Sequence, residues 1–127
     1  MPLAQIEEIQ AGFSQCQAVT LADIASKTVL YVSAAKKQPQ ERLDALCEAA
    51  AEMLSGNAAQ DLVAASGGDS DDLMQESIVI QGDETLIFLR SPVDPAEALL
   101  CVCEAGLDIR EFLAFGRSKL EEMANAH

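Results

Sequence analysis

Apolar and polar positions alternate most clearly in three stretches near the middle of the chain. They span residues 77–81, 85–90 and 99–103. In the first stretch, Ile78 and Ile80 alternate with Val79 and Gln81, which is the period of two that a half-buried strand requires. Polar or proline-containing breaks separate the three stretches, and prolines cannot donate to a strand ladder. The pattern therefore predicts a meander of three consecutive strands.

Two further strands are predicted earlier in the chain, around residues 19–21 and 29–32. A polar interruption at 23–27 separates them, so the pair is typical of a β-hairpin. The interruption lacks Asn-Gly or any glycine, which are the commonest hairpin turn residues.

Three stretches show the spacing of amphipathic helices, at 3–14, 41–54 and 107–124. Gly56 follows the second of them and suits a left-handed helix cap. The positions expected to face the core are Leu3, Ile6, Ile9 and Phe13 in the first, Leu43, Leu46, Cys47, Ala50, Met53 and Leu54 in the second, and Ile109, Phe112, Leu113, Gly116, Leu120 and Met123 in the third.

The predicted element order is α-β-β-α-β-β-β-α, which indicates one α+β domain over residues 1–127. We expect a single antiparallel sheet of five strands with helices packed on it, in the manner of a profilin-like sandwich. Residues 57–75 interrupt this order, and we expect a flexible or partly helical acidic insertion there. Asp69, Asp71 and Asp72 begin like a calcium loop, but the glycine and glutamate that such a loop needs do not follow.

The charge of the chain restricts its partners. The formal net charge is −13 at pH 7, so we expect neither nucleic acid nor an anionic membrane surface to bind. The N-terminus lacks the basic and apolar regions of a signal peptide, and no apolar run reaches a membrane-spanning length. The four cysteines lie in apolar settings and are interpreted as reduced core thiols. These features predict a cytoplasmic protein.

The sequence shows no catalytic signature. It contains no phosphate-binding loop, no dinucleotide fingerprint and no nucleophile elbow, and its one histidine is the C-terminal residue. A general base and zinc ligands are therefore lacking. We expect no catalytic residue, no metal and no cofactor, and we interpret the protein as a non-enzyme.

Two features suggest contact with another protein. On the second predicted helix, Ala45 and Ala49 form a bare shoulder beside an acidic ridge that includes Glu52. Such a shoulder permits close approach by another helix, although alanine is also simply the best helix former. Phe115 falls at the edge of the buried stripe of the last helix, where it either covers the core margin or contacts a partner.

The order of elements resembles the roadblock/LC7 family over nearly the whole chain. The matching pieces are VTLADIASKTVLYVSA, QERLDALCEAAAEMLSG, SIVIQGDETLIFLRSP and ALLCVCEAGLDIREFLAFGRSKLEEMA. The chain departs from the family in two places. It has Lys27 and Thr28 where the first hairpin usually carries a glycine, and its 57–75 segment is longer than the usual connection.

The resemblance implies a non-catalytic homodimer whose central helix and third strand form the two-fold interface. Such proteins act mainly as regulators or scaffolds of small GTPases, or as dynein subunits. The implied interface residues are Ala45, Ala49, Glu52, Ile78, Val79 and Ile80. The uncharged run between Ser77 and Gly82 agrees, because it would make a poor free edge.

Two alternatives remain open on the sequence. One is an acidic dimeric secretion chaperone that binds an effector protein, because such chaperones are also small, acidic and α+β. The strand predicted at 99–103 speaks against it, since those chaperones usually run straight into a helix there. The other is a small sensor or profilin-like domain.

Overall fold

The computed structural model describes residues 2–69 and 72–125, and it contains the predicted elements in the predicted order. One further helix, α3, lies within the 57–75 insertion. The elements are α1 (Pro2–Gly12), β1 (Cys16–Asp23), β2 (Thr28–Ala34), α2 (Gln40–Ser55), α3 (Asn57–Ala65), β3 (Glu76–Gln81), β4 (Glu84–Arg90), β5 (Glu97–Glu104) and α4 (Ile109–Asn125).

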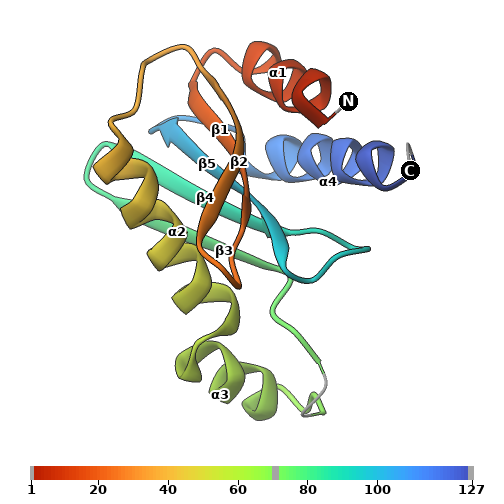
Figure 1. Ribbon diagram of the computed structural model, residues 1–127. Coiled ribbons are helices and arrows are strands. Elements are labelled where there is room, and N and C mark those ends of the chain that lie inside the picture. Colours follow the sequence, from red (N-terminus) through yellow and green to blue (C-terminus); the bar gives the residue numbers. More distant parts are fainter. Residues whose placement is uncertain (1, 70–71, 126–127) are drawn as a thin grey trace.

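The five strands form one antiparallel sheet in the order β2-β1-β5-β4-β3, as expected for the fold class. The hairpin and the meander therefore join through β1 and β5, which occupy the interior of the sheet. Figure 1 shows α1 and α4 side by side on one face of the sheet and α2 on the other. The two edge strands are β2 and β3.

A separate apolar core lies on each face of the sheet. Central strands contribute to both cores, which explains why β5 reads as an almost continuous apolar run (Glu97–Glu104) rather than an alternating one. The core under α1 and α4 includes Ile6, Ile9, Val19, Ile87, Leu89, Leu99 and Phe112. The core under α2 includes Leu43, Leu46, Leu54, Leu86, Phe88, Leu100 and Val102.

The predicted buried stripe of α2 is correct except at one position. Leu43, Leu46, Cys47, Ala50 and Leu54 are buried. Met53, however, is 43% exposed. The five buried positions define a stripe whose centre lies to one side of Met53. The side chain of Met53 therefore lies at the flank of the helix, next to Ala49.

The end of α2 also differs from expectation. Gly56 has φ −75°, so it does not adopt the left-handed conformation, and α3 begins at the next residue. A side chain at Gly56 would meet the carbonyl oxygen of Glu52 at 2.6 Å. Glycine is therefore required there by close packing.

Helix α3 accounts for the first part of the 57–75 insertion, and Ala59 is its one buried residue among those described. Leu62 on the same helix is 62% exposed. Figure 1 shows α3 beyond the end of α2, away from the sheet. Asp71 of the predicted acidic loop lies outside the described residues.

The turn between β1 and β2 forms without glycine. Lys27 takes the left-handed conformation that glycine adopts most easily, with φ 59°. The carboxylate of Asp23 accepts hydrogen bonds from the backbone N–H groups of Ala25 and Ser26, each at 3.0 Å. These bonds hold the turn and offset the cost of the Lys27 conformation.

Among the described residues, no helix is both long and apolar enough to cross a membrane.

Candidate interaction surface

Strand β3 forms one edge of the sheet, because β4 is its partner on one side and the described chain supplies none on the other. Its six residues pair with β4 without a bulge. An edge of this kind presents unpaired backbone N–H and C=O groups, which form a template for another strand.

The side chains of β3 leave this edge apolar and uncovered. Ile78 is 38% exposed and Ile80 is 72% exposed. Val79 points to the opposite face, where it packs against the core under α2. The three interface residues expected on this strand therefore divide between the two faces, with Val79 partly buried against the core under α2.

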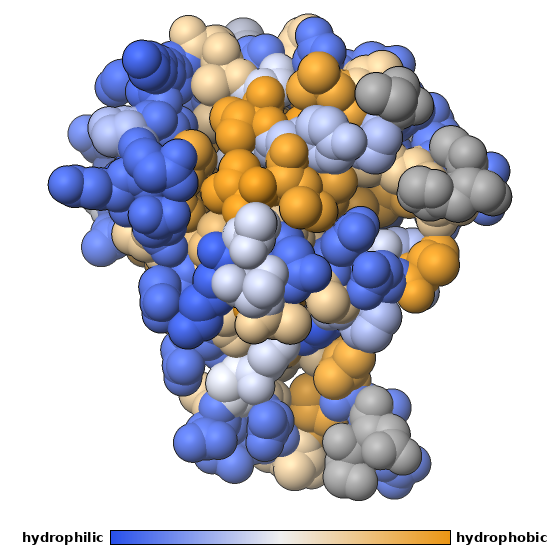
Figure 2. All heavy atoms as spheres, in the orientation of Figure 1, coloured by the Kyte–Doolittle hydropathy of each residue, from blue (hydrophilic) through white to orange (hydrophobic). Residues whose placement is uncertain are grey.

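The opposite edge strand, β2, is built differently. Its pairing with β1 shifts register between Leu21 and Ala22, which leaves Leu30 as the extra residue of a β-bulge. Bulges twist an edge and discourage pairing with another chain. Figure 2 shows apolar atoms gathered over β2, and Leu30 is 41% exposed. This edge therefore offers apolar surface without a regular ladder.

The flank of α2 beside the β3 edge carries small or exposed side chains. Ala45 is exposed, Ala49 is half-buried and Met53 lies one turn further along the same stripe. The guanidinium of Arg42 forms a 2.7 Å ion pair with Glu84 at the start of β4, which fixes this flank toward the β3–β4 side of the sheet. Glu52 is exposed at the border of the stripe. The predicted shoulder of α2 and the edge of β3 thus belong to one side of the molecule.

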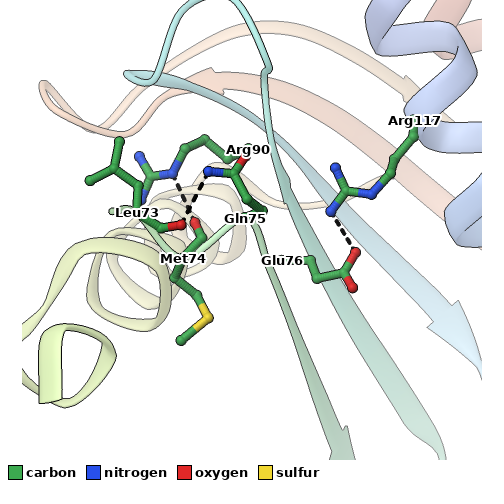
Figure 3. Close-up of polar contacts among 6 residues, drawn as sticks. All are labelled: Leu73, Met74, Gln75, Glu76, Arg90 and Arg117. Atoms are coloured by element: carbon green, nitrogen blue, oxygen red, sulfur yellow. Dashed lines mark hydrogen bonds and ion pairs between the residues drawn. The ribbon is translucent and has the colours of Figure 1, made fainter. Parts of the chain in front are cut away.

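Arg90 anchors the segment that leads into β3 (Figure 3). The residue is 3% exposed. Its guanidinium donates to the carbonyl oxygens of Met74 at 2.9 Å and Leu54 at 2.6 Å, and to that of Pro95. Burial lowers the pKa of Arg90. The end of α2, the segment before β3 and the loop between β4 and β5 are thereby held to the end of β4.

Sequence reasoning did not identify this role of Arg90. The only available signal was a single arginine at the end of an apolar strand, immediately before Ser-Pro. The backbone acceptors that surround the guanidinium have no signature in the sequence, because any residue carries a carbonyl.

The α4 side of β3 is fixed by an ion pair. Figure 3 shows the guanidinium of Arg117 reaching the carboxylate of Glu76, at 2.6 Å. This contact lies at the beginning of β3 and so leaves Ile78 and Ile80 uncovered further along the strand.

Phe115 is half-buried and lies between α4 and α1. Its ring meets that of Phe13 edge-on at 5.7 Å, and the Nζ of Lys119 lies 5.1 Å from the ring centroid. Lys119 in turn forms ion pairs with Glu8 and Glu122. These contacts give Phe115 a place in the packing of the two helices.

The described residues provide no group of three His, Cys, Asp or Glu side chains placed to hold a metal ion. The polar residues near β3 act through ion pairs and backbone hydrogen bonds. The candidate surface on this side of the molecule consists of the β3 edge and the α2 flank.

No protein-family model matches the sequence, and no curated protein matches it either. Solved structures do resemble it. The roadblock/LC7 domain from Streptomyces avermitilis is 11% identical, with a TM-score of 0.73 over 98% of this chain and 95% of that one. MglB in a tetrameric arrangement is 20% identical, with a TM-score of 0.78 over 98% and 85%.

The gliding protein MglB from Thermus thermophilus is 19% identical, with a TM-score of 0.73 over 98% of this chain and 89% of that one. At such low identity these similarities establish the shared architecture. They extend over nearly the full length of this chain and agree with its element order and its single five-stranded sheet. The chain therefore has the roadblock/LC7 fold.

Proposed function

We propose that the protein is a non-catalytic homodimer that regulates or scaffolds a small GTPase. The observation that carries the dimer is the unbulged and uncovered edge of β3, which is uncharged from Ser77 to Gln81 and lies beside the small-residue flank of α2. The fold supports the regulatory part, because the family that the sequence resembles acts mainly on small GTPases.

In the proposed dimer, β3 pairs with β3 of a second copy around a two-fold axis and joins the two sheets into one. This pairing satisfies the outer backbone groups of both strands, which an isolated chain leaves to water. A two-fold interface uses the same surface on both copies, so one favourable strand edge is sufficient.

The two-fold axis also brings the α2 helices together. Ala45 and Ala49 allow close approach of the backbones, and Met53 supplies an adaptable apolar side chain between them. Ile78 and Ile80 would lie beside their counterparts on the opposite face of the joined sheet. Glu52, which is exposed, belongs at the rim, where charge is tolerated.

Phe115 has a smaller place in this proposal. Its contacts with Phe13 and Lys119 occupy part of its ring, so a partner would reach only the part that stays exposed. The central contribution to binding is assigned to β3 and α2.

The secretion-chaperone alternative receives no support from the fold. Such chaperones usually run straight into the last helix after the strand that corresponds to Thr85–Arg90. Instead, β5 (Glu97–Glu104) intervenes and occupies the interior of the sheet between β1 and β4. The roadblock/LC7 fold has a strand at that position.

The dimer can be tested by placing a charge on the strand edge. We expect Ile80→Lys to convert a dimer into a monomer, as measured by light scattering coupled to gel filtration, because two ammonium groups would face each other across the axis. Val93→Lys is the matched control. Val93 is 68% exposed on the loop between β4 and β5, and the same substitution there should leave the mass unchanged.

Circular dichroism should show that both variants remain folded, because both positions are exposed. A wild-type chain that is monomeric at micromolar concentration would overturn the dimer. If Ile80→Lys remained a dimer, β3 would not be the interface, and the chain would dimerise through another surface.

The regulatory role requires a separate experiment. Wild-type protein immobilised on a resin should capture a small GTPase from a lysate of its native cell, with Ile80→Lys run in parallel. Recovery of a secreted effector without a GTPase would favour the chaperone and contradict the proposed role. The nucleotide bound to the captured GTPase can then be varied to show which state is recognised.

A further inference from the structure

Three of the four cysteines lie in the core beneath α1 and α4. They are Cys16 on β1 and Cys101 and Cys103 on β5, and each is a free thiol that is at most 1% exposed. The fourth, Cys47, lies in the core under α2, on the other side of the sheet.

A β-bulge turns Cys16 toward this core. In a regular strand, Cys16 and Ala18 would share a face, because alternate residues point to the same side. The register between β1 and β5 shifts between these two residues, so that Gln17 is the extra residue. Ala18 consequently packs under α2, whereas Cys16 packs under α1 and α4. Re-aiming a side chain is a known effect of bulges.

The bulge places Cys16 directly opposite Cys103 in the antiparallel pair. Facing residues in such pairs have Cα atoms roughly 4.5–5.5 Å apart, which lies within the range that a disulfide spans. Cys101 faces Val19 instead, and its diagonal separation from Cys16 is roughly 7–8 Å for such a register. Cys103 is therefore the partner that the geometry selects.

The two facing thiols also interact. A hydrogen bond from the Cys103 thiol lowers the pKa of Cys16, and the same bond raises the pKa of Cys103. Of the two thiols, Cys16 is therefore the one that ionises more readily. A thiolate beside a protonated thiol is the arrangement that thiol oxidation uses.

We propose that Cys16 and Cys103 form a redox-active dithiol, which a small peroxide oxidises to an intramolecular disulfide between β1 and β5. The Cys16 thiolate attacks one peroxide oxygen, the O–O bond breaks, and hydroxide leaves as Cys16 becomes a sulfenic acid. The Cys103 thiol then attacks the Cys16 sulfur. The S–S bond forms, the S–O bond breaks, and the oxygen leaves as water with the Cys103 proton.

Two electrons pass from the two sulfurs to the peroxide, and hydrogen peroxide ends as two molecules of water once the hydroxide has taken up a proton. The oxidant must reach buried sulfur, so the reaction proceeds through local opening of the chain around Phe13 and α1, next to Cys16. It should therefore be slower than oxidation of an exposed thiol.

The disulfide would tie the first strand in the chain, β1, to the last, β5, which is its neighbour in the sheet. The cross-link closes most of the chain into one loop and lowers the entropy of the unfolded state, so the oxidised protein should be the more stable form. Because β1 and β5 lie in the sheet interior, this inference does not depend on the dimer proposed through β3.

The test uses the full-length wild-type chain, freed of reductant and treated with hydrogen peroxide under native conditions. Peptide mapping without reduction should recover the Cys16 peptide linked to the Cys103 peptide. Titration of the unfolded product should show two thiols in place of four. The midpoint of thermal unfolding should rise by roughly 10 °C and return when dithiothreitol is added.

Cys47→Ala is the control and should form the same link. In Cys103→Ala, a dione probe should trap the Cys16 sulfenic acid, because the resolving thiol is gone. Linkage of Cys101 or Cys47, links between chains only, or no link in protein that remains folded would each overturn the proposal. The wild-type mapping decides the question even if the Cys103 variant does not fold.

Discussion

Lys27 shows how a single residue can occupy a conformation that its side chain disfavours. Its φ of 59° lies in the left-handed region, which costs a residue with a Cβ about 1–2 kcal/mol. Its Nζ lies 3.2 Å from the carboxylate of Glu48, but both side chains are well exposed, so the ion pair contributes little. The Asp23 carboxylate, which accepts two backbone N–H groups, is the main support of the turn.

We expect Lys27→Gly to raise the free energy of unfolding by about 0.5–1 kcal/mol, because glycine adopts this φ without strain. Urea denaturation measures the change, provided that the slope with denaturant stays constant. Lys27→Ala is the matched control, since it removes the same ion pair but keeps the Cβ. A glycine variant no more stable than the alanine variant would show that the turn is not strained.

Arg90 is a single residue whose side chain stabilises the backbone around it. Without its guanidinium, buried carbonyl groups would lack hydrogen-bond donors. Leu54 lies near the end of α2, Met74 precedes β3, and Pro95 lies between β4 and β5. Their carbonyl oxygens need hydrogen-bond donors where they are buried. One guanidinium supplies them all, and its charge is spread over five N–H groups that need no carboxylate nearby. The start of β3 is therefore held in place by a residue of β4.

At the scale of whole elements, α4 packs closely on the sheet at Gly116. A Cβ at Gly116 would lie 2.8 Å from a methyl carbon of Leu89 on β4, which is itself fully buried. The glycine that helix propensity disfavours is therefore required by the packing of this helix on the strand. Its place in the buried stripe was correctly predicted from spacing alone.

Gly116→Val should lower the free energy of unfolding by about 2–3 kcal/mol, because the added methyl groups force α4 and Leu89 apart. Ser118→Val provides the control, since it introduces the same side chain on the exposed side of the same helix. Thermal or urea unfolding compares the two variants. Equal stability of both would mean that α4 moves freely away from the sheet.

At the scale of the whole molecule, the two edges of the sheet differ in how well they could pair with another chain. Both end strands carry exposed apolar side chains, but only β2 contains a bulge, so the two edges differ in their capacity to pair. A net charge of −13 opposes random association of copies, because it acts over the whole surface and at long range. The run Ser77–Gln81 of β3 carries no charge, so the proposed pairing there would add no direct charge repulsion between the two strands.

The pattern of apolar residues was sufficient to determine the five strands, the three long helices, their order and the fold class, whereas helix α3 was left open. This succeeded because strands and helices bury their faces at fixed periods, and those periods are local properties. Met53 shows the limit of the method. Its spacing fits the buried stripe of α2, yet it is exposed, because the packing of the helix on the sheet decides which flank is covered and that packing is not local.

The tertiary structure alone decided which residues from distant segments meet. The strand order β2-β1-β5-β4-β3 places β3 at an edge and β1 beside β5, and no periodicity within a strand encodes its neighbours. The bulge at Gln17 likewise turns Cys16 toward Cys103, because one extra residue reverses the face of everything before it. The apolar pattern thus determined which surfaces must be buried, whereas long-range pairing determined the partners against which they are buried.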